Sequence, residues 1–155
     1  MAKKLALIAS KGSLDWAYPP FILASTAAAL DYEVQIFFTF YGLTLLKKDL
    51  ADLKVSPLGN PAMPMPVPMP NFVQMLPGME SMATLMMKQK IAGKGVASIE
   101  DLRTACLESG VKLIACQMTV DLFDFKPADF IAGIEYGGAA TFFEFAGESD
   151  VNLFI

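Results

Sequence analysis

The chain has 155 residues and a net charge of −4, which is enough sequence for one domain with its own hydrophobic core. The acidic balance disfavours nucleic acid as a partner, because no basic patch is available to neutralise phosphates. The chain has no histidine, which excludes Ser-His and Cys-His nucleophile pairs and most zinc and iron sites, so we expect no metal site and no cofactor.

Apolar residues make up 54% of the chain and charged residues only 18%, against the ~25% charged residues typical of soluble domains. We therefore expect surface to be buried beyond one core, most simply between the subunits of a homo-oligomer. Residues 16–30 are the longest apolar candidate for a membrane span, but they contain two prolines and fall short of the ~20 residues required. No transmembrane segment or signal peptide is predicted, and the expected localisation is cytoplasmic, where a structural disulfide is not expected.

Short apolar runs alternate with helical segments from the start of the chain. Residues 4–10 predict a buried strand, and a turn then leads into a helix that runs to about residue 30. Pro19 and Pro20 are expected within the first turn of this helix, where proline is tolerated. A second strand is predicted over residues 32–38 and a short helix over 41–50.

Residues 57–77 interrupt this alternation with seven of the ten prolines. Eight of the ten methionines lie here or in the adjoining segment that ends at residue 87. Because proline lacks an N–H, this tract predicts an extended, polyproline-like loop, an insertion over about 56–80 in a single domain that spans 1–155. Its methionines favour a flexible lid or a subunit contact, and Cu(I) binding or a peripheral membrane contact are the alternatives.

The alternation resumes after the insertion and continues to the last residue. The elements expected there are helices over 80–93, 98–110, 119–125 and 137–145, and strands over 111–116, 131–136 and 151–155. Strands that alternate with helices predict an α/β domain with a mostly parallel five-stranded sheet and helices on both faces.

Cys116 ends one predicted strand and precedes a helix that begins near Thr119. Ligands of α/β proteins bind at the carboxyl ends of strands, and a helix N-terminus stabilises a thiolate and lowers its pKa. Cys116 is therefore the candidate catalytic nucleophile, with a small buried hydrophobic side chain as the alternative. Cys106 is expected in the core, because the predicted helix and strand separate the two α-carbons by more than the ~7 Å that a disulfide allows.

Three other positions are candidates to assist Cys116. Lys11 follows the first strand and could stabilise a thiolate, although residues 10–13 also fit a structural turn and match no phosphate-binding loop motif. Gly137 and Gly138 open a predicted helix, where unobstructed amides could bind an anion. Tight backbone packing is the alternative explanation for these two glycines.

Three segments, residues 106–121, 133–142 and 150–155, resemble the DsrE/DsrF-like sulfur-relay family, and the first strand with its turn fits as well. The likeness is strongest to a subgroup labelled peroxiredoxin-like, whose members have a second cysteine at the position of Cys106 and a similar insertion. Neither cysteine lies in a Pro-x-x-x-Thr-x-x-Cys arrangement, so the residues give that label little support. The resemblance implies a flavodoxin-like or Rossmann-like subunit, a trimer or hexamer, and a persulfide on Cys116.

The leading hypothesis is a sulfur carrier or sulfurtransferase-like protein, and whether it is an enzyme stays open. Cys116 would take sulfane sulfur from a donor protein and pass it to an acceptor cysteine, because exchange needs an accessible thiolate. One alternative is a non-enzymatic oligomeric binding or scaffold protein in which Cys116 is merely buried. Another is a thiol redox protein that uses Cys106 and Cys116, which would require a large rearrangement.

Overall fold

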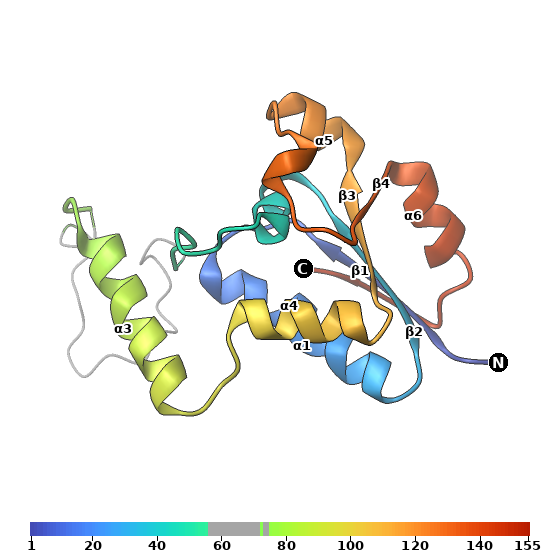
Figure 1. Ribbon diagram of the computed structural model, residues 1–155, viewed down its shortest axis with the longest axis horizontal. Helices are drawn as coiled ribbons and strands as arrows, with labels where there is room; N and C mark the ends of the chain where they lie inside the picture. Colours follow the sequence, from blue (N-terminus) through green and yellow to red (C-terminus); the bar gives the residue numbers. More distant parts are fainter. Residues whose placement is uncertain (56–71, 73–74) are drawn as a thin grey trace.

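Five parallel strands form one sheet at the centre of the protein. The computed structural model describes residues 1–55, 72 and 75–155 (Figure 1). The strands are β1 (Lys4–Ala9), β2 (Glu33–Phe38), β3 (Lys112–Cys116), β4 (Glu135–Gly137) and β5 (Val151–Phe154). Their order is β4-β3-β2-β1-β5, and every neighbouring pair is parallel, which confirms the expected α/β sheet.

Helices connect the strands in nearly the order expected. They are α1 (Leu14–Ala29), the 3₁₀ helix η1 (Phe40–Leu46), α3 (Met79–Gly93), α4 (Ile99–Glu108), α5 (Gln117–Leu122), the 3₁₀ helix η2 (Pro127–Asp129) and α6 (Ala139–Ala146). The predicted loop over 57–77 lies mostly outside the described residues. The segment expected as a helix over 41–50 is a short 3₁₀ helix that begins at Phe40, whose φ is +48°.

One prediction about α1 is wrong. Pro19 and Pro20 lie in the second turn of this helix, because the helix begins at Leu14. Each proline removes one backbone N–H from the helical ladder, yet the helix continues to Ala29. Pro20 is fully buried, so burial of its ring against the core compensates for the missing donor.

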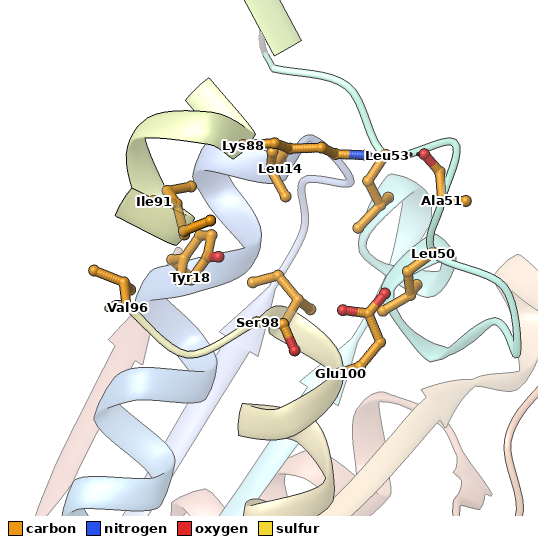
Figure 2. A pocket seen from close by; sticks show the side chains of 12 residues that line it. Leu14, Tyr18, Leu50, Ala51, Leu53, Lys88, Ile91, Val96, Ser98 and Glu100 are labelled. Atoms are coloured by element: carbon orange, nitrogen blue, oxygen red, sulfur yellow. Dashed lines mark hydrogen bonds between the residues drawn. The ribbon is translucent and has the colours of Figure 1, made fainter. Parts of the chain in front are cut away.

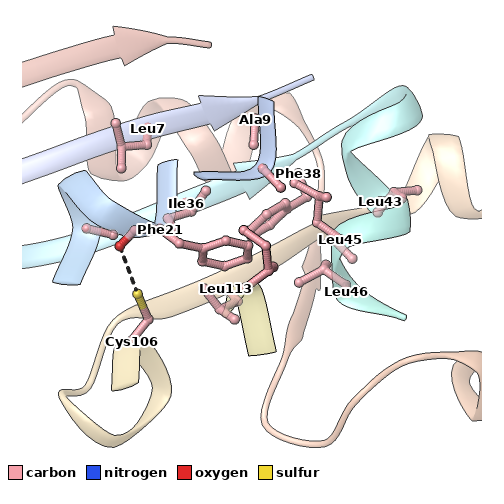
Figure 3. Close-up of a cluster of buried hydrophobic side chains, with 14 of the residues drawn as sticks. Leu7, Ala9, Phe21, Ile36, Phe38, Leu43, Leu45, Leu46, Cys106 and Leu113 are labelled. Atoms are coloured by element: carbon pink, nitrogen blue, oxygen red, sulfur yellow. Dashed lines mark hydrogen bonds between the residues drawn. The ribbon is translucent and has the colours of Figure 1, made fainter. Parts of the chain in front are cut away.

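Helices cover both faces of the sheet, as expected, but unequally. Figure 1 shows α1 and α4 side by side on one face and α6 on the other. The main core lies under α1 and α4 and includes Phe21, Ile36, Phe38 and Leu113 (Figure 3). A smaller cluster on the α6 face contains Phe37, Ile114 and Cys116, with Phe142 packed against it.

Arg103 fixes η1 against the body of the domain. Its side chain is buried in α4 and donates to the carbonyl oxygens of Leu45 at 2.8 Å and Lys47 at 2.7 Å. Buried charged groups are tolerated only when they are hydrogen-bonded in this way. Burial lowers the pKa of Arg103, while Glu100 acts in the opposite direction. η1 begins one residue after β2, and the end of β2 pairs with the end of β3, so the first residues of η1 lie near the end of β3.

Within the described part of the chain, none of the helices has the length and apolar character needed to cross a membrane.

Candidate functional site

Cys116 is the last residue of β3 and occupies the N-cap position of α5. The helix expected to begin near Thr119 thus begins directly after the cysteine. Across the sheet, Cys116 pairs with Gly137 of β4. Its side chain is only 5% exposed and lies in the small cluster on the α6 face. The sequence therefore placed the thiol correctly at a helix start, and the structure adds that it is covered.

The pKa of Cys116 lies below the usual thiol value. Burial acts to raise the pKa, but neighbouring polar groups outweigh it. The groups that lower the pKa are the hydroxyl and N–H of Thr119, the hydroxyl of Thr39 and the N–H of Met118, and the Cys116 side chain makes no capping hydrogen bond to α5. They stabilise the thiolate more than the thiol, because a charged acceptor strengthens each bond.

Thr39 and Thr119 form a hydroxyl pair beside the sulfur. Their Oγ1 atoms are 3.3 Å apart, and Thr119 Oγ1 also accepts the N–H of Phe40 at 3.3 Å. Thr119 is fully buried and Thr39 is half-buried. Sequence reasoning found Thr119 but missed Thr39. The signal for Thr39 was its position as the first residue after β2, which becomes informative once β2 and β3 are known to be neighbours.

Cys106 is separated from Cys116 by the sheet. It is fully buried in the main core under α1, and its sulfur donates to the Phe21 carbonyl oxygen at 3.5 Å (Figure 3). Burial raises the pKa of Cys106 to about 11, although the Ser25 backbone N–H acts in the opposite direction. Both cysteines are free thiols. Cys106 is thus a poor nucleophile, and its position agrees with the structural role expected for it.

Lys11 is engaged away from Cys116. Its ammonium lies 3.3 Å from the centroid of the Trp16 ring, which is a close cation–π contact. Both residues line a cavity of about 410 Å³ that Tyr41 also borders. Lys11 is not among the groups that shift the pKa of Cys116.

Gly137 and Gly138 connect β4 to α6 next to Cys116. A side chain at Gly137 would place its Cβ 2.8 Å from Thr141 Oγ1, so tight packing explains this glycine. Gly138 is the N-cap residue of α6 and donates its N–H to Thr141 Oγ1 at 3.4 Å. A Cβ at Gly138 would meet open space. The structure therefore brings both glycines to the strand end where Cys116 lies. Packing against Thr141 explains Gly137, and Gly138 is the N-cap residue of α6.

The surface around α5 is apolar. We call it the α5 surface and define it by four exposed side chains, Phe40, Tyr41, Met118 and Leu122. Phe123 joins η1 to α5, because its ring contacts those of Phe40 at 6.2 Å and Tyr41 at 5.9 Å. Exposed apolar surface that surrounds a reactive group is typical of protein docking sites.

A second cavity, of about 280 Å³, lies between α1, α3 and the start of α4 (Figure 2). Its lining is mainly apolar, and Figure 2 shows Leu14, Tyr18 and Ile91 around it, with Lys88 and Glu100 at its edges. Cys116 does not line this cavity. Among the described residues, no group of three His, Cys, Asp or Glu side chains is placed to hold a metal ion.

Comparisons with known proteins agree on one family. A family model described as the DsrE/DsrF/DrsH-like family matches residues 1–154. The sulfur carrier protein DsrE2 of Allochromatium vinosum is 69% identical over 157 residues, and the match covers 99% of this chain and 98% of that protein. The uncharacterized protein YrkE of Bacillus subtilis is 32% identical over 157 residues, and the match covers 99% of this chain and 97% of that protein.

The fold has a solved counterpart. The crystal structure of the ychN protein from E. coli superimposes with a TM-score of 0.57 and covers 99% of each chain. At 11% identity this likeness concerns the fold alone. The match over nearly the whole sequence, together with the parallel five-stranded sheet, confirms the resemblance seen in the sequence, and the chain belongs to the DsrE/DsrF/DrsH-like family.

Proposed function

We propose that this chain is a sulfur carrier that holds sulfane sulfur as a persulfide on Cys116 and passes it to an acceptor cysteine of a partner protein. The observation that carries the proposal is the position of Cys116 at the carboxyl end of β3 and at the start of α5, where its thiol pKa is lowered in a chain without histidine. The name of the DsrE2 relative, a sulfur carrier protein, supports the same role.

Loading and discharge are both thiolate exchanges. In loading, the Cys116 thiolate attacks the outer sulfur of a donor persulfide, a new S–S bond forms, and the donor leaves as a thiolate. In discharge, the acceptor thiolate attacks the outer sulfur on Cys116, and the Cys116 thiolate leaves with the electron pair of the broken bond. Neither step needs an oxidant or a reductant. Free thiols are required on both partners, which suits the reducing cytoplasm.

Sulfur donor and acceptor proteins would meet Cys116 at the α5 surface. Of the exposed side chains of that surface, Met118 and Leu122 lie on α5, which begins directly after Cys116, and Phe40 and Tyr41 begin η1. Phe142 packs against the cluster that contains Cys116 and is itself only half-buried. Because Cys116 is only 5% exposed, an attacking group must displace a covering side chain, and Phe142 is the candidate.

We also propose that the carrier is a homo-oligomer, a trimer or a hexamer. All four residues of β5 are exposed although β5 is a strand of the sheet, and they include Val151, Leu153 and Phe154. Phe143 adds a further exposed ring on α6. Apolar surface of this kind on an edge strand is normally covered by a partner chain. Sedimentation as a monomer at micromolar concentration would contradict this proposal.

The burial of Cys116 favours one competing function, a non-enzymatic scaffold. Incubation with a polysulfide donor, followed by mass spectrometry of peptides, separates the two. A sulfur adduct on Cys116 that persists in Cys106→Ser and disappears in Cys116→Ser is expected for the carrier. No adduct in the native protein, together with alkylation of Cys116 only after denaturation, would reject the carrier and leave the scaffold.

A further inference from the structure

The cavity beside Lys11 lies where α/β proteins bind ligands, and the proposed sulfur transfer does not use it. Its volume is about 410 Å³, within the ~300–1,000 Å³ typical of small-molecule sites. It lies beyond the end of β1, because Lys11, Gly12 and Ser13 follow that strand and line the cavity together with Trp16 from the first turn of α1. The carboxyl end of a parallel strand is the usual location of a ligand in this type of sheet. We call this space the Lys11 cavity.

Hydrogen bonds fix the loop before residue 56 that forms another wall of the cavity. The Lys54 carbonyl oxygen accepts the first N–H of α1, from Leu14, at 2.7 Å. The next residue, Val55, donates its N–H to the Thr84 hydroxyl of α3 at 3.0 Å, and this contact is buried. The loop is therefore held to two helices. A cavity that is formed before its ligand arrives costs less conformational entropy on binding.

The turn after β1 packs tightly against η1. A Cβ at Gly12 would collide with the carbonyl oxygen of Tyr41 and the hydroxyl of Thr44. The Thr44 hydroxyl in turn donates to the Tyr41 carbonyl oxygen at 2.7 Å. The Tyr41 backbone is thus held in place, while its side chain, on a residue that is 66% exposed, borders the cavity.

Charges of both signs line the Lys11 cavity. Lys54 and Glu80 lie 3.9 Å apart and offset each other. Lys11 and Asp52 form no ion pair with any other residue that the structure describes. The Lys11 ammonium instead lies 3.3 Å from the centroid of the Trp16 ring. A cation–π contact leaves the charge in place, so one ammonium and one carboxylate remain for a ligand.

This pattern of charge limits the class of ligand. A phosphate or another simple anion would be repelled by the two carboxylates, and the turn after β1 matches no phosphate-binding motif. A simple cation would be repelled by the two lysines in the same way. A zwitterion satisfies Lys11 and Asp52 together, and the exposed residues Trp16 and Tyr41 offer aromatic surface to the rest of such a molecule.

We propose that the Lys11 cavity binds a free apolar amino acid or a short apolar peptide. The carboxylate of the ligand accepts from the Lys11 ammonium, the ammonium of the ligand donates to the Asp52 carboxylate, and its apolar side chains contact Trp16 and Tyr41. This binding does not depend on the chemistry of Cys116. Because Tyr41 also belongs to the α5 surface, the bound ligand would adjoin the surface at which partner proteins are proposed to dock.

Trp16 is the single tryptophan of the chain, so intrinsic fluorescence reports on this cavity. Wild type is titrated at neutral pH with L-leucine and with L-leucyl-L-leucine, which differ in size but share both charges. Two further probes have one charge each, because N-acetyl-L-leucine lacks the ammonium and L-leucinamide lacks the carboxylate. We expect a saturable change with at least one zwitterion, and binding about fivefold weaker for each probe with one charge.

Two variants assign the charges of the ligand to their partners. Lys11→Met should weaken binding of the zwitterion about fivefold and leave L-leucinamide unchanged, because that probe has no carboxylate. Asp52→Asn should also weaken binding of the zwitterion but leave N-acetyl-L-leucine unchanged. Lys48→Met is the matched control, because Lys48 is exposed and does not line the cavity. Its affinity for every probe should equal that of wild type.

Absence of saturation with both zwitterions overturns the proposal. A probe with one charge that binds wild type as tightly as the zwitterions, or a Lys11→Met protein with wild-type affinity for them, also overturns it. The four wild-type titrations decide the question even if a variant does not fold. The indole N–H of Trp16, observed by NMR in labelled protein, should shift with the same saturation curve, and ligand-induced shifts that leave this group unchanged would refute binding in this cavity.

Discussion

Cys106 and Cys116 lie on opposite faces of the same sheet. Cys106 belongs to the core under α1 and α4, and Cys116 belongs to the cluster under α6. Neighbouring residues of a strand point to opposite faces, so the strand that ends in Cys116 directs Leu113 and Ala115 to one cluster and Ile114 and Cys116 to the other. The two thiols therefore have different environments, and their chemistry can be measured separately in one protein.

The first prediction concerns the two thiols at neutral pH. Cys116 should be alkylated in the native protein with an apparent pKa below the usual thiol value, because hydrogen-bond donors stabilise its thiolate despite burial. Because folding lowers the pKa of Cys116, its thiolate stabilises the folded state at pH values above the pKa that Cys116 has in the unfolded chain. This stabilisation is lost as the pH falls through the lower pKa of the folded state. Cys106 should stay unmodified until the chain unfolds, and equal labelling of both would contradict this prediction.

The second prediction concerns stability at high pH. Burial raises the pKa of Cys106 from 9.0 to about 11, so the folded state keeps the thiol neutral while the unfolded chain ionises it. The resulting stability is complete below the unfolded pKa and is lost as the pH rises toward 11, roughly 2–3 kcal/mol in all. Urea unfolding at about pH 8 and about pH 10.5 should show a smaller loss in Cys106→Ala than in wild type. The same loss in both would show that other groups cause it.

The third prediction concerns access to Cys116. Phe142 packs against the cluster that contains the sulfur, and Phe142→Ala should increase the rate of Cys116 alkylation at constant pH. Leu85→Ala is the control, because Leu85 lies on α3, is 57% exposed and is not part of the cluster that contains Cys116. Removal of this exposed side chain should leave the rate unchanged. Equal acceleration in both variants would indicate a general loosening of the protein.

The fourth prediction concerns Arg103. Arg103→Met keeps the apolar stem but removes both hydrogen bonds to the carbonyl oxygens of Leu45 and Lys47. One buried and one partly buried carbonyl oxygen then lose this partner, which should lower the free energy of unfolding by about 2–3 kcal/mol in urea titrations. Lys90→Met, at an exposed position of α3, should change it by less than about 0.5 kcal/mol.

The alternation of apolar runs and helices was enough to predict the sheet, because strands buried on both faces are apolar almost throughout. It also placed Cys116 at the end of its strand. The prolines of α1 misled the prediction, because local propensity took no account of Pro20 being buried in the core. The 3₁₀ helix that replaces the helix expected over 41–50 depends on Phe40 and on the Arg103 anchor, and neither is visible as a local pattern.

The site itself was predicted only in part. Helix dipoles suggested a stabilised thiolate, and Thr119 was named as the residue near which the helix after Cys116 begins. Thr39 is 77 residues from Cys116 and joins it only through the β2–β3 pairing. Lys11 was a reasonable candidate from its position after β1, but a cation–π contact with Trp16 holds its ammonium instead. Hydroxyls that act across strands cannot be recognised before the strand order is known.

The strand order has a consequence for how the sheet assembles. β1 to β4 can add side by side in the order in which they are synthesised, whereas β5 must cross back to the free side of β1. That pairing joins Leu5 to Val151, and Lys4 reinforces it through its N–H to Asp150 at 2.7 Å and its ammonium to Glu148 at 2.8 Å. Closure of so long a loop is entropically costly and slow. We therefore expect a folding intermediate with four strands formed and one side of β1 open, a state prone to pair with a neighbouring chain.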